Sequence, residues 1–390
     1  MKYPLKSIFH SEIFCIIILI FLFWLGFSTI TPFLPLYSQK ISFSPYEISL
    51  FLSVASLSRV VFQPILGIFI SKKNERLIIN LSFTCLLLSS AAYLFFDNFY
   101  LLTFIRIIEG AAIASFIISI RVLINRFDIK KTALINNYYS GAQNFGSFIA
   151  PSLAGFYVEK IGIKSIFWIS TIIYTLANFI TFKLPKVSEN NKNAKEFSGS
   201  FYKSIYPYLS IIIIHSLEFI GLGLWLGGWS VYAKESLNWA FNKIGLSFSI
   251  IAISGVLVTP FLSYILKNEY RKKMIFGLIL LALQSLNVVI FKNYEIILWL
   301  SFIAGGIGAT MYFSSFHSLV STIVPQKEIA IFYGFMGSFI FAGQAIGFAL
   351  APILGNISNN LPIILDAVLL LITAFLYKLF FIFFSKKAVN

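Results

Sequence analysis

Residues 13–36 read IFCIIILIFLFWLGFSTITPFLPL and include no charged side chain. A helix needs about 20 mainly apolar residues to cross the hydrocarbon core of a bilayer, so this run is long enough to span it. The run is too long for the core of a signal peptide and lacks a small-residue cleavage site. We therefore expect it to be retained as a first transmembrane helix.

Eleven further runs meet the same condition, so the sequence predicts twelve transmembrane helices and an all-α membrane protein. The composition agrees, because 58% of the 390 residues are hydrophobic and only 12% are charged, which is too apolar for a soluble domain. The predicted spans are residues 13–36, 46–70, 77–96, 99–125, 132–157, 165–183, 207–232, 242–266, 274–291, 296–322, 330–355 and 363–384.

The basic residues predict the orientation of these helices. Of the 30 Lys and Arg residues, four lie well inside predicted helices (Arg59, Arg106, Arg121 and Lys378). Lys and Arg at the ends of predicted helices are counted with the adjoining loops. Six then belong to loops on one side (Lys40, Lys160, Lys164, Lys234, Lys243 and Lys292), which leaves 20 on the other side. Basic residues concentrate in cytoplasmic loops, so we expect both termini in the cytoplasm. Richness in Ile, Lys, Asn and Phe is typical of an AT-rich bacterial genome, which suggests a bacterial inner membrane.

Several functions are disfavoured by what the sequence lacks. The net charge of +15 lies mainly in short loops and reads as a topology signal, so no nucleic-acid partner is expected. Cys15 and Cys85 sit inside apolar runs, where a thiol behaves as a small hydrophobe, and no metal site is expected. No glycine-rich nucleotide loop occurs, and we expect neither a cofactor nor ATP-driven transport by this chain alone.

The chain divides into two related halves. The longest polar stretch, which includes SENNKNAKE at residues 188–196, predicts a cytoplasmic linker over 184–206 between six-helix bundles at 1–183 and 207–390. An internal repeat at an offset of 196 residues supports two pseudo-symmetric bundles in the same orientation, which is one architecture of secondary transporters. The residues Ile48, Leu50, Ser53, Pro64, Leu66, Gly110 and Gly141 match Ile244, Leu246, Ser249, Pro260, Leu262, Gly306 and Gly337.

Three predicted helices carry unusual residues. Helix one has Leu25-Gly26 followed by Pro32 and Pro35, whose freed backbone groups suit a protein-lined cavity. Helix four has Leu102, Arg106, Glu109 and Gly110, with two ionisable groups at i,i+3 on one face at membrane depth. Helix five has small residues at four-residue spacing around a proline, which permits close helix packing. These residues are Gly141, Gly146, Ala150, Pro151, Ala154 and Gly155.

These motifs resemble those of the major facilitator superfamily over the whole chain, and within it those of the twelve-helix drug:proton antiporters. Glu109 stands where the family usually has glutamine. In the loop after helix two Gly67 fits the family motif, but Ser71 replaces the family's aspartate and Asn74 its second glycine. In the family that aspartate belongs to a cytoplasmic charge cluster that steadies the outward-open state, so the resemblance does not extend to the usual form of this cluster.

The ionisable residues inside the predicted helices are the functional candidates, because charge is costly in the membrane. Glu218 in helix seven is the best candidate for a proton site, since a carboxyl group in low dielectric is costly to ionise. Arg106 and Glu109 are candidates for proton coupling, with a purely structural ion pair as the alternative. Arg59 needs a partner, which Glu218 or an anionic substrate would supply.

We also expect Arg59, His215, Trp225 and Pro32 to line a substrate cavity, although tryptophan near a helix end more often anchors at the membrane interface. Gly110, Gly146, Pro151, Gly155 and Gly67 more plausibly serve packing and conformational change. Four other ionisable residues are interpreted as interfacial, because they lie near predicted helix ends: Arg121, His317, Lys378 and Asp366.

The sequence thus predicts a carrier, acting as a monomer, for proton-coupled export of a small organic molecule by alternating access. The first alternative is a transporter of a siderophore or another carboxylate, for export or uptake. A polytopic membrane enzyme is a remote alternative, since it would need a cluster of His, Asp or Glu at a membrane face, and the chain has three histidines.

Overall fold

The computed structural model describes residues 11–70, 75–127, 132–184, 206–265, 269–325 and 329–387, and this part of the chain is helical throughout apart from short turns. The first half contains α1 (Ser11–Ile30), η2 (Thr31–Phe33), α2 (Leu34–Lys40), α3 (Pro45–Ile70), α4 (Glu75–Phe95), α5 (Phe99–Phe127), α6 (Thr132–Ile161) and α7 (Ser165–Thr181). The second half contains η4 (Tyr206–Tyr208), α9 (Leu209–Glu235), α10 (Phe241–Ile265), α11 (Tyr270–Ile290), α12 (Glu295–Ile323), α13 (Ile329–Ile357) and α14 (Leu361–Lys387).

Each predicted transmembrane span corresponds to a helix in the structure. Within the described residues, ten spans are long and apolar enough to cross a membrane. The remaining two predicted spans are α6, a 30-residue helix, and α7, a shorter helix of 17 residues. The predicted linker over 184–206 lies outside the described residues except for its first and last positions.

The first span is longer than the sequence predicts. Its prolines do not end the helix, because the chain passes through the single 3-10 turn η2 and continues as α2 to Lys40. Pro32 stands near the start of η2 and Pro35 near the start of α2, where a missing N–H is tolerated. The carbonyl of Pro32 accepts a hydrogen bond from the Ser230 hydroxyl of α9, so the break in α1 faces protein.

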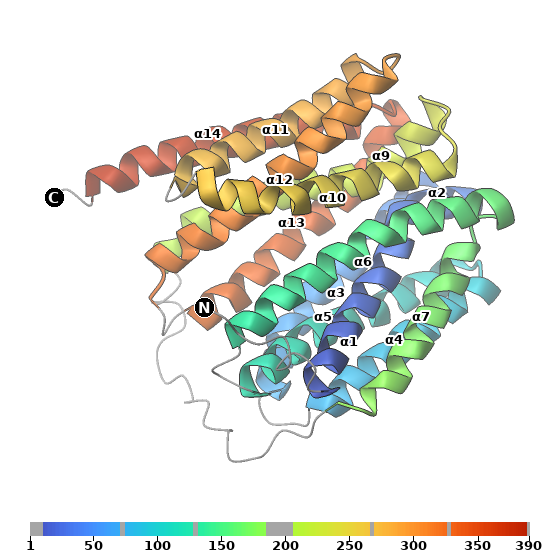
Figure 1. The fold of residues 1–390 in the computed structure, drawn as a ribbon. Helices are drawn as coiled ribbons and strands as arrows, with labels where there is room; N and C mark the ends of the chain where they lie inside the picture. The colour runs from blue at the N-terminus through green and yellow to red at the C-terminus, as the bar shows by residue number, and fades with distance from the viewer. Residues whose placement is uncertain are drawn as a thin grey trace.

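The helices form two bundles that repeat one another. The starts of α3, α5 and α7 recur 196 residues later as the starts of α10, α12 and α14 (Pro45 to Phe241, Phe99 to Glu295, Ser165 to Leu361). In Figure 1 the bundle α9–α14 lies above the bundle α1–α7, and the two meet through α3 against α13 and α6 against α10. The two contacts are related by the repeat, because α10 is the repeat partner of α3 and α13 is the repeat partner of α6.

The repeat extends to single contacts. A Cβ added at Gly110 of α5 would lie 2.3 Å from the carbonyl oxygen of Ala55 in α3. The equivalent Cβ at Gly306 of α12 would lie 2.1 Å from the carbonyl oxygen of Ile251 in α10, which is the repeat partner of Ala55. Both halves therefore use the same glycine-mediated helix contact.

The bundles approach each other most closely at one end, which we call the convergent end, where the turns 41–44, 236–240 and 358–360 lie. They diverge toward the end at which α1 begins and α14 ends (Figure 1). Small residues of α6 and α10 allow the approach: a Cβ at Gly245 would lie 2.1 Å from the Pro151 carbonyl oxygen, and one at Gly155 would lie 2.3 Å from the Phe241 carbonyl oxygen.

We predict that Gly245→Ala lowers the melting temperature of the purified protein, because backbone on α6 leaves no room for the added methyl group and overpacking typically costs about 1–3 kcal/mol. Gly141→Ala is the matched control, since no atom of the described residues lies within 4 Å of a Cβ there. Equal melting temperatures for the two variants in a thermal unfolding assay would show that α6 and α10 are not in this contact.

Candidate functional site

An ion pair is buried in the first half, as the sequence predicts. Arg106 Nη1 lies 2.8 Å from Glu109 Oε1, and the other carboxylate oxygen, Oε2, accepts a hydrogen bond of 2.8 Å from the Tyr93 hydroxyl. Arg106 Nε also donates to the carbonyl of Phe51 at 3.4 Å. This cluster joins α3, α4 and α5 and carries no net charge, so its burial is electrostatically compensated.

Arg59 lies where the two halves meet. Its guanidinium stands 5.5 Å from the ring centroid of Phe27 in α1 and 5.1 Å from that of Phe341 in α13. The side chain is buried, Nε has no hydrogen-bond partner, and Arg59 forms no ion pair within the described residues. Glu218 is therefore not its ion-pair partner, and the stacking between rings of both halves is what stabilises the charge.

Two carboxyl groups lie inside the second half. Glu218 of α9 and Asp366 of α14 are each only 3% exposed. Asp366 Oδ2 accepts a hydrogen bond of 2.6 Å from the Ser285 hydroxyl of α11, whereas Glu218 Oε2 has no partner in the described part of the chain. Neither carboxyl forms an ion pair there. The interpretation of Asp366 as interfacial is thus wrong, because α14 carries it into the bundle between α9 and α11.

His215 lies one turn before Glu218 on α9 and is buried within the second half rather than at the seam with the first. Its Nδ1 lies 2.5 Å from the Tyr312 hydroxyl, and its ring stacks on Phe316 at 3.7 Å between centroids. The Tyr312 hydroxyl lies 3.5 Å from that of Tyr377 in α14. A row of polar groups thus follows the face of α9 that is turned toward α12 and α14.

The tryptophans of α9 belong to the protein core and not to a lipid interface. Trp225 and Trp229 stack at 5.1 Å between ring centroids, and Trp229 is completely buried with its indole N–H donating to Ser247 at 2.9 Å. Arg121, His317 and Lys378, the three other residues interpreted as interfacial, are exposed, and their interfacial position stays a prediction. Gly146 packs against the backbone of α1, near Leu25 N. The surroundings of Gly67, and residues 71 and 74 of its loop, lie outside the described part.

Hydrogen bonds close the convergent end across the two halves. Glu159 of α6 accepts from the Phe241 backbone N–H at 2.8 Å, and Ser152 donates to Ser249 at 2.7 Å. A third bond, from Ser56 of α3 to the amide oxygen of Gln344 at 3.2 Å, lies deeper along α3 and α13. In the described residues no hydrogen bond joins the halves nearer the divergent end.

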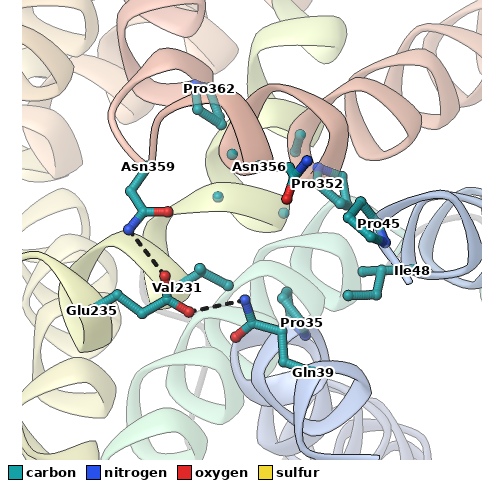
Figure 2. A pocket seen from close by; sticks show the side chains of 14 residues that line it. Pro35, Gln39, Pro45, Ile48, Val231, Glu235, Pro352, Asn356, Asn359 and Pro362 are labelled. Carbon is teal, nitrogen blue, oxygen red and sulfur yellow. Dashed lines mark hydrogen bonds between the residues drawn. The ribbon is translucent and has the colours of Figure 1, made fainter. Parts of the chain in front are cut away.

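A pocket of about 320 Å³ opens between the halves at the convergent end. Glu235 of α9 stands at its wall and accepts from Gln39 Nε2 of the first half at 3.1 Å and from Asn359 Nδ2 of the second half at 2.9 Å (Figure 2). Pro35 and Ile48 of the first half line the opposite side. The sequence alone does not single out Glu235, because a carboxylate next to a predicted loop is an ordinary surface residue.

Two repeated six-helix bundles, packed around ionisable groups at membrane depth, define a secondary transporter. The model of the family described as Major Facilitator Superfamily matches residues 16–233 and 211–389. The chain belongs to this superfamily.

Curated relatives and solved structures agree with this assignment. The chain is 23% identical to the quinolone resistance protein NorA of Staphylococcus aureus (strain MSSA476) over 91% of this chain and 92% of NorA. It is 22% identical to the multi-drug resistance efflux pump PmrA of Streptococcus pneumoniae serotype 4, over 84% of this chain and 85% of PmrA.

Among solved structures, the fold is similar to the nucleoside transporter NupG, with a TM-score of 0.74 and 16% identity over 95% of this chain and 99% of NupG. It is also similar to the human organic anion transporter MFSD10, with a TM-score of 0.71 and 14% identity over 96% of this chain and all of MFSD10 (100%). At these identities the structures support the fold alone.

We predict that Glu235→Ala weakens closure of the convergent end, because it removes the acceptor that binds Gln39 across the halves. In a background of Cys15→Ser and Cys85→Ser, the thiol of Leu52→Cys, one turn below Ile48 and buried, should react faster with a polar thiol reagent. Glu295→Ala is the control, since it removes an ion pair with Lys243 (2.8 Å) that lies within the second half. Equal labelling rates in both variants would contradict a latch at Glu235.

Proposed function

We propose that this transporter exports a small organic molecule, a drug-like compound or metabolite, from a bacterial cell in exchange for protons, and that it acts as a monomer. The names of its relatives, a quinolone resistance protein and a multi-drug efflux pump, support this direction and substrate class. Placing both termini in the cytoplasm puts the convergent end outside. In the described conformation the two halves then meet at the outer side and diverge at the cytoplasmic side, which is the arrangement expected of a carrier that accepts its substrate from inside.

The observation that carries the proton coupling is a pair of buried carboxyl groups, Glu218 and Asp366, that have no cationic partner in the described part of the chain. An ionised carboxylate that lacks a counter-charge in the membrane interior is very costly, and two such groups together are costlier still, so the pair holds at least one proton. Export requires that this proton be taken from outside and released inside.

The charges of the first half have different roles. Arg106 and Glu109 neutralise each other and brace three helices, so we assign them to coupling through the position of α5 rather than to proton release. Arg59 lies between Phe27 and Phe341 of opposite halves, where a substrate between the bundles would meet it. Pro32 and Trp225 lie nearer the convergent end, and His215 lies inside the second half; none of the three is placed beside Arg59.

A transporter dedicated to siderophores or other carboxylates is not favoured by the relatives, which are named for drug resistance. A membrane enzyme is not favoured either, because the family and the similar structures are transporters.

We predict that Glu218→Gln reduces proton-driven accumulation of ethidium or of a fluoroquinolone in everted vesicles to the level of vesicles without the protein, because the amide cannot bind and release a proton. Asp97→Asn should transport like the unaltered protein, since Asp97 is an exposed residue at the convergent end, 3.1 Å from Lys164. Unchanged, pH-dependent transport by Glu218→Gln would contradict the proposed function.

A further inference from the structure

Asp366 is inserted into the second half with a defined position for each of its carboxylate oxygens. Oδ2 accepts the hydrogen bond from Ser285 of α11 at 2.6 Å. Oδ1 lies against Gly221 of α9, where an added Cβ would stand 2.5 Å from it. Any larger residue at position 221 would push the carboxyl away, so the glycine makes the approach of Asp366 to α9 possible.

Glu218 lies on the same face of α9 as Gly221, because residues three apart in a helix are neighbours. The two carboxyl groups thus meet within about one helical turn, and both are nearly completely buried. Glu218 Oε2 has no hydrogen-bond donor within the described chain. The two acids differ in one respect: Asp366 has a hydroxyl donor and Glu218 does not.

Among the described residues, the other groups around the pair supply no positive charge. The neighbouring helices contribute His215 on α9, Ser285 on α11, Tyr312 on α12 and Tyr377 on α14, whereas Gln284 of α11 lies against Gly305 of α12. On α13, Gln344 is bonded to Ser56 of the first half and Tyr333 to His317, so neither faces the acids. His215 bonds to Tyr312, and burial disfavours its charged form.

We propose that Glu218 and Asp366 form a single proton-binding site, in which two carboxyl groups share one proton and Ser285 makes Asp366 the ionised partner. The reasoning is electrostatic: two adjacent buried carboxylates cannot both stay ionised without a cation. A hydroxyl donor stabilises the charged form, so the negative charge resides on Asp366 and the proton on Glu218. The inference rests on the proposed proton coupling and adds the second acid and its positioning residue, Ser285.

This site is separate from the seam between the halves. The opposite face of α9 packs on α13, where a Cβ at Gly347 would lie 2.1 Å from the Ile220 carbonyl oxygen and one at Gly223 would lie 2.4 Å from the Gln344 carbonyl oxygen. The proton site therefore lies on the face of α9 turned away from α13, the helix that carries Phe341 beside Arg59. For a substrate bound beside Arg59, coupling passes through the position of α9 against α13 rather than through competition for the same carboxylate.

The test is an infrared titration of the purified protein without substrate, following the carbonyl band of protonated carboxyl groups against pH. Subtracting each variant from the unaltered protein isolates the pair. The pair should titrate in two steps. Glu218→Gln and Asp366→Asn should each leave one step, about one pH unit or more below the upper step of the unaltered protein, because the like charge is gone.

Ser285→Ala is a milder variant that keeps both acids, and it should move the lower step to higher pH, because Asp366 loses its donor. Asp97→Asn is the matched control and should leave both steps in place. The proposal is overturned if each acid titrates at the same pH whether or not the other is present, or if Ser285→Ala moves neither step.

The titration is independent of transport. Two coupled steps together with transport that does not depend on pH would disprove proton-coupled export but keep the shared site. Proton-driven export by a protein whose two acids titrate independently would keep the proposed function but disprove the shared site.

Discussion

The cost of placing a charge inside a membrane-embedded bundle is the constraint on which this structure depends. In the first half that cost is met within the protein, since Arg106, Glu109 and Tyr93 form a closed, neutral cluster. In the second half that cost is not met by an ion pair, since Glu218 and Asp366 have no cationic partner among the residues that the structure describes. The same architecture therefore holds a permanent brace in one half and, on our proposal, an exchangeable proton in the other.

The internal repeat explains how these halves meet. Because α3 and α10 are repeat partners, and α6 and α13 likewise, the contacts α3–α13 and α6–α10 are two versions of one seam. The glycines of α6 and α10 bring backbones together near the convergent end, and Glu235 ties Gln39 to Asn359 there. A seam that can part at either end, while each bundle keeps its own core, is what alternating access requires.

Much of this architecture follows from the sequence, because its causes are local. Apolar runs set the helices, the offset of 196 residues sets the two bundles, and the i,i+3 spacing of Arg106 and Glu109 sets their ion pair. From the sequence, Pro32 and Pro35 are expected to break the first helix. That the helix resumes after one 3-10 turn at Thr31–Phe33 could not be predicted, because the tolerance of a proline depends on its neighbours in space.

Contacts between distant helices could not be predicted in the same way. Asp366 reads as interfacial because it lies near a predicted helix end, and only the packing of α14 against Gly221 and Ser285 shows its depth. The repeat offered one signal, since Asp366 falls on Ser170, which is completely buried in the first half. Arg59 lacked any such signal, because its aromatic neighbours come from α1 and α13.

The most direct test of the central claim, that buried acids couple this carrier to protons, is to count protons as the compound moves. Proteoliposomes loaded with ethidium and a pH-sensitive dye, with equal pH on both sides, would be diluted into compound-free buffer. The account predicts that the lumen acidifies as ethidium leaves, and that no acidification occurs without the protein. Protein-dependent loss of ethidium at constant lumenal pH would contradict it.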